Sequence, residues 1–302
     1  MKIGFVNSGK SFLPEISAYV AYLNQQDNME AITILTAEMN EIPIANIDLL
    51  WKFTGLDIKK YSSETKIIHE YNSLSIGHFA MLKNYVKKTC NIKPHGRIFL
   101  NELVEKDLKM KGNIPKIHRD MGISKDFFIK TSKKEYDFVY VGDMGHGRGI
   151  DHALKPFTTT LKDNTILLIG NPTNELYKSF KDYKNIIFSG SLPYHEVPLL
   201  ASKAEYGLNY IPDVYPFNLQ ASTKLLEYCA LDLKIVSTDY PWVNNFEQKT
   251  QGRFFKLHRN LANLTMTNLN SFEFVTPDVS YLEWNLLLDR VKLIEFIKLV
   301  MG

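Results

Sequence analysis

The most informative segment of the chain spans residues 218–239 and reads NLQASTKLLEYCALDLKIVSTD. Leu225 and Cys229 lie four residues apart, and this spacing predicts an apolar stripe along a short helix. Ser222 or Thr223 is a suitable N-cap just before that stripe. An apolar run follows the helix and indicates a strand. The stretch therefore predicts a loop, a helix and a strand, the repeating unit of an α/β fold.

Two charged side chains near the start of this helix suggest a binding site. Lys224 and Glu227 lie three residues apart and therefore share one face. The free N–H groups and the positive dipole end of a helix N-terminus suit a phosphate. The lysine can add a charge to a diphosphate, and the glutamate can accept hydrogen bonds from a ribose. An ordinary αβ unit with a solvent-facing Lys–Glu pair has the same spacing, so spacing alone leaves both interpretations open.

The run STKLLEYCALDLKIVSTDYP, residues 222–241, resembles the signature of GT-B glycosyltransferases, and most closely the bacterial family 4-like enzymes of capsule, O-antigen and lipopolysaccharide synthesis. Lys224 and Glu227 fall on that signature. The resemblance implies that the helix binds a nucleotide-sugar donor and that Glu227 binds its ribose. Asp232 stands where the family usually has glycine, and Leu219 stands where it has a second glutamate facing the donor sugar.

A glycine-rich loop, GDMGHGRG at residues 142–149, follows the apolar run Phe138–Val141. Four glycines in eight positions predict a backbone that turns sharply or approaches a ligand closely. The resemblance implies that Arg148 and Gly149 contact the donor diphosphate, whereas Asp143 stands where a first arginine is usual. A loop without a ligand remains the alternative.

The resemblance also implies that the nucleotide base lies near the loop around Ser191 and Leu192. No Asp-x-Asp motif is present, so we expect neither a metal ion nor a cofactor, with UDP- or GDP-linked sugar as substrate. The donor-binding residues that the resemblance implies are Gly9, Arg148, Gly149, Gly170, Ser191, Leu192, Asn218, Ser222, Thr223, Lys224 and Glu227.

The N-terminal part of the chain predicts a Rossmann-like βα unit. Lys2–Asn7 is an apolar run, and the turn Ser8-Gly9-Lys10-Ser11 separates it from apolar residues at helical spacing. The turn lacks the first glycine of a P-loop. The sequence has no G-x-G-x-x-G, which counts against a dinucleotide oxidoreductase.

His69 and Glu70 are the main catalytic candidates. They follow the apolar run Thr65–Ile68, and open α/β sheets bind their ligands at the carboxyl ends of strands. The segment resembles H-E-x-x-S turns of the transferases, in which a histidine of this region contacts the donor sugar or the acceptor. A histidine with a purely structural partner is the alternative.

Strand-like and helix-like runs alternate throughout, so we expect an α/β protein. As the resemblance implies, two Rossmann-like doubly wound domains would face a central cleft. We expect an acceptor-binding domain over residues 1–134 and a donor-binding domain over residues 135–281. Residues 282–302 would form a helix that crosses back to the N-terminal domain.

Charge and composition bear on location. Cys90 and Cys229 lack metal spacing and fit a reducing compartment, and neither a signal peptide nor a membrane-spanning run is recognisable, so we expect a cytoplasmic protein. Residues 1–134 hold 20 Lys+Arg and 14 Asp+Glu, a balance of +6, against −3 for the rest. This basic half could lie on the inner face of the cytoplasmic membrane or attract a phosphate-bearing acceptor, although solvated lysines are the simpler interpretation.

The segment Phe79–Lys88 predicts an amphipathic helix with Phe79, Leu82 and Val86 on one side and Lys83 and Lys87 on another. A helix that covers the sheet and a helix on a membrane surface both fit this pattern. No nucleic-acid-binding signature is present.

We therefore expect a metal-independent, retaining glycosyltransferase that moves a sugar from a nucleoside diphosphate to a glycan or lipid-linked acceptor in cell-surface polysaccharide synthesis. Because Leu219 replaces a glutamate, inversion with His69 or Glu70 as general base stays open. A nucleotide-sugar epimerase of the same fold and a non-catalytic nucleotide-sugar-binding partner of another transferase are the alternatives.

Overall fold

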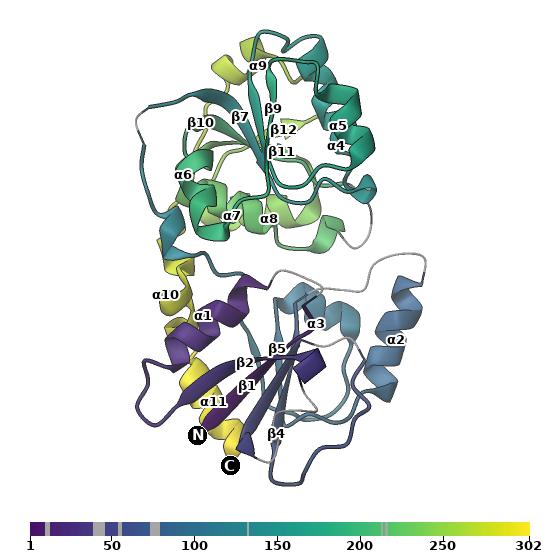
Figure 1. Ribbon diagram of the computed structural model, residues 1–302, viewed down its shortest axis with the longest axis vertical. Helices are drawn as coiled ribbons and strands as arrows, with labels where there is room; N and C mark the ends of the chain where they lie inside the picture. Colours follow the sequence, from purple (N-terminus) through teal and green to yellow (C-terminus); the bar gives the residue numbers. More distant parts are fainter. Residues whose placement is uncertain are drawn as a thin grey trace. The chain divides into compact units, whose positions relative to one another are not determined.

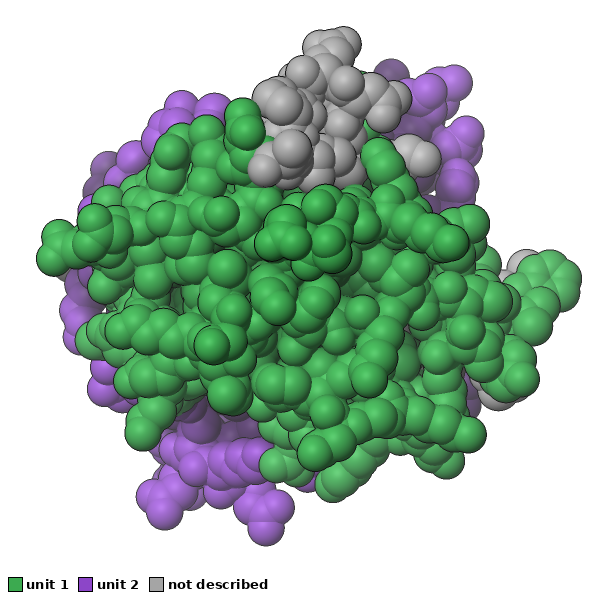
Figure 2. Space-filling model, turned by 90° about the horizontal axis from the view of Figure 1, so that it is seen from below, with its two compact units in different colours: residues 1–122, 282–302 green, residues 123–281 purple. Residues whose placement is uncertain are grey.

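The computed structural model describes residues 1–9, 13–38, 46–53, 56–72, 79–131, 133–212, 214 and 217–302. The chain forms two compact units, shown in Figures 1 and 2. Unit 1 comprises residues 1–122 and 282–302, and unit 2 comprises residues 123–281. The first unit ends at Gly122 and the second begins at Ile123. The sequence had predicted this boundary between residues 134 and 135. Lys10 and Ser11 of the glycine turn and Ser73 of the H-E-x-x-S turn lie outside the described residues.

Unit 1 is built on a six-stranded sheet in the order β2-β1-β3-β4-β5-β6, and every pair of neighbours is parallel. Its strands are β1 (Lys2–Asn7), β2 (Glu30–Leu35), β3 (Leu49–Phe53), β4 (Lys66–Tyr71), β5 (Gly96–Phe99) and β6 (Lys116–His118). The strand order reverses between β1 and β3, as in doubly wound α/β sheets.

The helices of unit 1 come from both ends of the chain: α1 (Pro14–Leu23), α2 (Ala80–Cys90), α3 (Glu102–Leu108), α10 (Trp284–Arg290) and α11 (Leu293–Met301). Figure 1 shows α10 and α11, in yellow, near α1. The Trp284 ring lies 6.2 Å from the Tyr19 ring. A Cβ atom on Gly122 would lie 2.3 Å from Trp284, so only glycine leaves room for the indole.

Unit 2 has a second six-stranded parallel sheet in the order β12-β11-β10-β7-β8-β9. Its strands are β7 (Tyr136–Val141), β8 (Ile166–Ile169), β9 (Ile186–Gly190), β10 (Ala204–Asn209), β11 (Lys234–Thr238) and β12 (Phe255–Leu257). Its helices are α4 (Ile150–Leu154), α5 (Asn174–Phe180), α6 (Val197–Ala201), α7 (Thr223–Ala230), α8 (Pro241–Thr250) and α9 (Met266–Ser271).

Burial on both faces of the sheet explains the apolar strands. All four residues of β8 are buried, as expected for a parallel strand covered by helices on both sides. In the core of unit 2 the Phe138 and Tyr206 rings stack with centroids 5.0 Å apart. The segment 218–239 contains the helix α7 and the strand β11, as predicted. The prediction of two doubly wound α/β halves is confirmed.

Candidate functional site

The candidate site lies at the carboxyl ends of β7 and β10 in unit 2. These two strands are neighbours at the point where the strand order of the sheet reverses. Doubly wound sheets bind their ligands at such a switch point, because the loops on either side of it diverge to opposite faces. The glycine-rich loop follows β7, and the segment leading to α7 follows β10. Two parts of the chain that the sequence singled out separately therefore meet here.

A buried hydrogen-bond chain fixes the start of α7. The Ser222 hydroxyl accepts a bond from the Leu225 N–H at 3.4 Å, which makes it the N-cap, and donates to Asn209 Oδ1 at 2.7 Å. Asn209 Nδ2 in turn donates to Ser237 Oγ at 2.8 Å. Because Asn209 ends β10 and Ser237 lies on β11, the helix N-terminus is held against the sheet.

Lys224 is half-buried and reaches the end of β7. Its Nζ lies 4.1 Å from the centre of the Tyr140 ring, a cation–π contact. A Cβ atom on Gly142 would lie 3.9 Å from the same Nζ, so the lysine runs beside the glycine-rich loop. Burial, aided by the positive charge of Arg148, lowers the pKa of Lys224 to about 7. An anion bound here would relieve that charge repulsion.

Arg148 supplies the second positive charge from the loop after β7. Its guanidinium carbon lies 4.7 Å from the centre of the Phe217 ring, and its Nε lies 3.2 Å from Asp143 Oδ2. Asp143 is thus the ion-pair partner of Arg148. The site holds two cations and one exposed carboxylate at its rim.

Glu227 lies one turn into α7 and is 5 % exposed. Burial raises the pKa of its carboxyl to about 7, while a hydrogen bond from Tyr194 and the charge of Lys224 act in the opposite direction. The Tyr194 hydroxyl donates to Glu227 Oε1 at 2.7 Å. Sequence reasoning missed Tyr194, because nothing local couples a residue after β9 to a residue on α7. Its ring packs on Phe127, with the centroids 5.3 Å apart.

The predicted glycines have different surroundings. A Cβ atom on Gly170 would lie 2.2 Å from the carbonyl oxygen of Gly142, and its φ is +143°. Gly170 therefore allows the glycine-rich loop to pack against the end of β8. Gly149, with φ +64°, lets the loop turn into α4. Gly9 follows β1 in unit 1, and its N–H donates to Asn7 Oδ1 at 2.9 Å.

The other predicted donor-binding residues lie on unit 2 around the same sheet edge. Ser191 is exposed and Leu192 half-buried just after β9, Asn218 lies in the short 3-10 helix Phe217–Leu219, and Thr223 is the first residue of α7. Their contacts with a donor stay predictions.

His69 and Glu70 lie on β4 with side chains in the interior of unit 1. They are 0 % and 1 % exposed. His69 Nε2 lies 3.0 Å from Asp57 Oδ2. Glu70 Oε1 lies 2.8 Å from Arg119 Nη2. A general base must reach the proton that it removes, so this burial favours structural roles. Their catalytic role stays a prediction.

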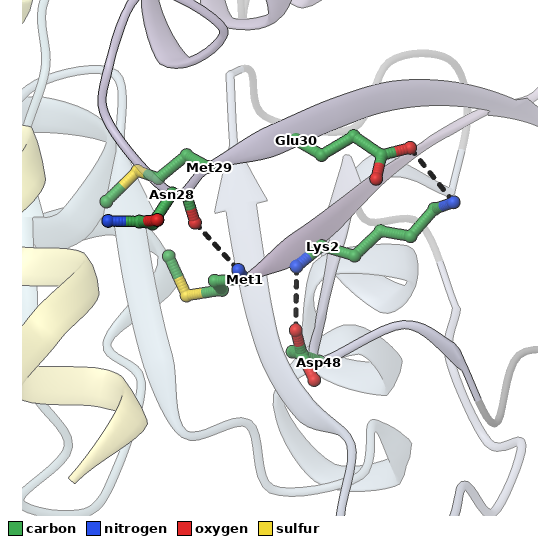
Figure 3. A pocket seen from close by; sticks show the side chains of 6 residues that line it. All are labelled: Met1, Lys2, Asn28, Met29, Glu30 and Asp48. Atoms are coloured by element: carbon green, nitrogen blue, oxygen red, sulfur yellow. Dashed lines mark hydrogen bonds and ion pairs between the residues drawn. The ribbon is translucent and has the colours of Figure 1, made fainter.

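A hollow of about 390 Å³ lies in unit 1 at the amino ends of the strands (Figure 3). Its polar groups bond one another: Lys2 Nζ lies 3.0 Å from Glu30 Oε1, and the Lys2 N–H donates to Asp48 at 2.7 Å. Ligands of parallel sheets bind at the opposite edge. We therefore assign no site to this hollow.

Within the described residues, no helix is long and apolar enough to span a membrane. The same part of the chain contains no group of three or more histidine, cysteine, aspartate or glutamate residues that could hold a metal ion.

No protein-family model and no curated protein matches the sequence. Solved structures do match over almost the whole chain. AviGT4, a glycosyltransferase involved in avilamycin A biosynthesis, is 12 % identical with a TM-score of 0.65, covering 100 % of this chain and 98 % of that one. Anabaena HepE in complex with UDP-glucose is 10 % identical with a TM-score of 0.68, covering 99 % and 98 %. S. aureus MnaA in complex with UDP is 10 % identical with a TM-score of 0.63, covering 100 % and 98 %.

At these identities the likeness concerns the fold. Two doubly wound parallel sheets in one chain, matched end to end by such structures, define the GT-B class. The expectation of a GT-B fold is confirmed.

Proposed function

We propose that the protein is a glycosyltransferase that binds a nucleotide-sugar donor at the β7–β10 switch point of unit 2. The observation that carries the proposal is the pairing of two cations, Arg148 and Lys224, beside the buried carboxyl of Glu227. The fold likeness over almost the whole chain to AviGT4, a glycosyltransferase, and to HepE in complex with UDP-glucose supports it. Among the described residues, Lys224 has no carboxylate within hydrogen-bond reach, and Arg148 pairs only with the exposed Asp143, which suits a site that takes up an anion.

In this proposal Arg148, Lys224 and the N-terminus of α7 bind the donor diphosphate. As the glycosidic bond breaks, negative charge grows on the diphosphate, and positive groups already in place stabilise that charge. Lys224 takes up a proton when the diphosphate arrives, because an adjacent anion raises its lowered pKa again. Glu227 accepts hydrogen bonds from the ribose hydroxyls. No metal ion is needed for these steps.

The finer parts of the proposal come from the sequence resemblance. They are membership of the family 4-like enzymes, retention of the anomeric configuration, and transfer to a glycan or lipid-linked acceptor in cell-surface polysaccharide synthesis. UDP is the first nucleotide to test, because Anabaena HepE and S. aureus MnaA were solved with UDP-glucose and UDP.

The donor site is tested by thermal shift with UDP, GDP, ADP, CMP and NAD⁺. A nucleotide at about 100 times its dissociation constant should stabilise the protein by about 2.7 kcal/mol. Arg148→Ala and Glu227→Ala should fold and lose this shift. Arg253→Ala is the matched control, because Arg253 forms an exposed ion pair with Glu273 in the same unit, at 2.6 Å. Stabilisation by none of the nucleoside diphosphates, or by NAD⁺ alone, would show the proposal to be wrong.

The reaction is tested with the nucleotide sugar whose diphosphate binds. Release of the sugar to water or to an added acceptor supports a transferase. Conversion of the donor sugar to its epimer would support the epimerase alternative, and binding without any turnover would support a non-catalytic role.

The same turnover assay tests the catalytic candidates His69 and Glu70. His69→Ala and Glu70→Gln are assayed for turnover and for thermal stability together. Loss of turnover at unchanged stability would establish a catalytic role. Loss of stability in proportion to turnover would establish the structural role that their burial favours.

A further inference from the structure

Helix α2 of unit 1 exposes two large apolar residues, while Val86 is half-buried. Leu82 and Tyr85 are 57 % and 63 % exposed, and Phe79, just before the helix, is 67 % exposed. They lie three residues apart and so share one face. By contrast, Asn84 is buried, with 8 % of its surface exposed.

The inward face of α2 carries polar and charged residues. Beside the buried Asn84, Lys87 and Lys88 are half-buried. Burial, aided by the charge of Lys83, lowers the pKa of Lys87. A helix that covers a sheet normally turns its apolar stripe inward. The sequence left open whether this helix covers the sheet or lies on a membrane surface. The exposure of Leu82 and Tyr85 favours a helix on a membrane surface.

A second exposed apolar segment lies at the C-terminal end of α2. Leu56 and Ile58 are 57 % and 65 % exposed. Asp57 between them is anchored at both backbone groups: its N–H donates to Asn91 Oδ1 and its carbonyl accepts from the Ile92 N–H, each at 2.8 Å. Asn91 follows α2 directly. We call Leu56, Ile58, Phe79, Leu82 and Tyr85 together the α2 patch.

The two segments that form the α2 patch carry a net positive charge. They carry the exposed lysines Lys59, Lys60, Lys83 and Lys93. Residues 79–93 contain no aspartate or glutamate. The one acid of the other segment, Asp57, is 3 % exposed and its Oδ1 lies 2.6 Å from Lys52 Nζ. Its charge is therefore compensated inside the unit.

We propose that the α2 patch binds the surface of an anionic membrane. Leucine, isoleucine and aromatic side chains can enter the boundary between headgroups and acyl chains, while lysines on long stems reach the lipid phosphates. Lysine is depleted in protein–protein interfaces, and a second copy would bring the same positive charges together. Charge complementarity therefore favours an anionic lipid surface over a protein partner or a second copy of this chain. This inference does not depend on the proposed function.

The test uses the whole protein with vesicles of phosphatidylcholine, alone or mixed with phosphatidylglycerol. Co-sedimentation should occur with the mixed vesicles, and high salt should weaken it. Leu82→Ser with Tyr85→Ser should reduce the partition coefficient at least about tenfold. Lys59→Gln and Lys60→Gln should each reduce it about fivefold. Leu286→Ser is the matched control, since Leu286 is an exposed leucine of unit 1, 53 % exposed on α10.

Cys90 offers a second readout, because it is exposed at the end of α2 whereas Cys229 is buried. An environment-sensitive dye on Cys90 should shift its emission to shorter wavelength with the mixed vesicles only. Equal binding to neutral vesicles, or patch variants that bind like the control, would overturn the proposal. So would a dimer in solution that the patch variants convert to monomer, because a second copy would then be the occupant.

Discussion

At the scale of single residues, the buried carboxyl of Glu227 links ligand binding to protonation at the candidate site. It has little exposed surface, and the Tyr194 hydroxyl is the hydrogen-bond donor that the structure gives it. Keeping such a group ionised costs free energy in a folded protein. A ribose hydroxyl or a nearby cation would return part of that free energy. Binding and protonation at this position are therefore linked.

The pKa of Glu227 predicts a pH dependence of stability. Its pKa rises from the ordinary 4.5 to about 7 on folding, so the folded state binds more protons between these values. The stabilisation by the neutral carboxyl is complete below pH 4.5 and is lost as the pH rises through about 7. Glu227→Gln resembles the neutral form at every pH.

We therefore expect Glu227→Gln to match the wild type near pH 4 and to be more stable by about 1–3 kcal/mol near pH 8. Urea unfolding at both pH values measures the difference. The charge of Glu227 raises the pKa of Lys224, so the variant loses this attraction, which reduces the expected gain. A variant that is less stable than the wild type near pH 8 would contradict the burial of an ionised carboxyl.

His69 and Glu70 show what a strand-end position leaves undecided. The last five residues of β4 are all buried, because this strand lies inside the sheet between β3 and β5 and is covered on both faces. Glu70 also receives a bond from Trp51 Nε1 at 2.7 Å. The residue types suggested a catalytic role. In the structure, the Glu70 side chain contacts Arg119 and the His69 side chain contacts Asp57 in the interior of unit 1.

At the scale of elements, the candidate site depends on how closely two strand ends pack. The glycine-rich loop contacts the end of β8 backbone to backbone, because Gly170 has no side chain. The start of α7 is held by Ser222 through Asn209. The elements themselves are local in sequence, but these two contacts between elements set the position of Lys224 and Arg148.

Gly170→Ala should destabilise unit 2 by about 2–4 kcal/mol, because the new Cβ would lie 2.2 Å from a backbone oxygen at a φ of +143°. Gly147→Ala is the matched control in the same loop, since no atom lies within 4 Å of its Cβ position. It should change stability by less than about 0.5 kcal/mol. Thermal unfolding measures both, and equal effects would contradict the packing role of Gly170.

At the scale of the whole molecule, the two units are compact bodies with separate cores, and the end of the chain belongs to the first. The Trp284 ring also covers Arg119, whose guanidinium carbon lies 5.1 Å from its centre. Leu287 and Leu288 on the same helix are fully buried. Residues remote in sequence thus complete the core of unit 1.

Trp284→Ala should lower the stability of unit 1 by about 3–5 kcal/mol and leave unit 2 nearly unchanged. Calorimetry with two resolved transitions would separate the units. A nucleotide that binds as proposed should raise only the transition of unit 2. If Trp284→Ala lowered the transition of unit 2 instead, the assignment of the C-terminal helices would be wrong.

The sequence by itself determined the alternation of strands and helices, the glycine-rich loop, and the helix and strand within residues 218–239. These features depend on spacing, N-caps and backbone freedom, which act between residues a few positions apart. Spacing drew attention to Lys224 and Glu227, and the resemblance to a known family made them and Arg148 candidates for a donor site.

Only the tertiary structure decided which side chains meet. It paired Glu227 with Tyr194 and Arg148 with Asp143, buried His69 and Glu70, and turned Leu82 and Tyr85 of α2 outward. The physical reason is that burial and charge depend on neighbours in space. In a doubly wound sheet those neighbours come from strands far apart in the chain, through a topology that local spacing does not encode.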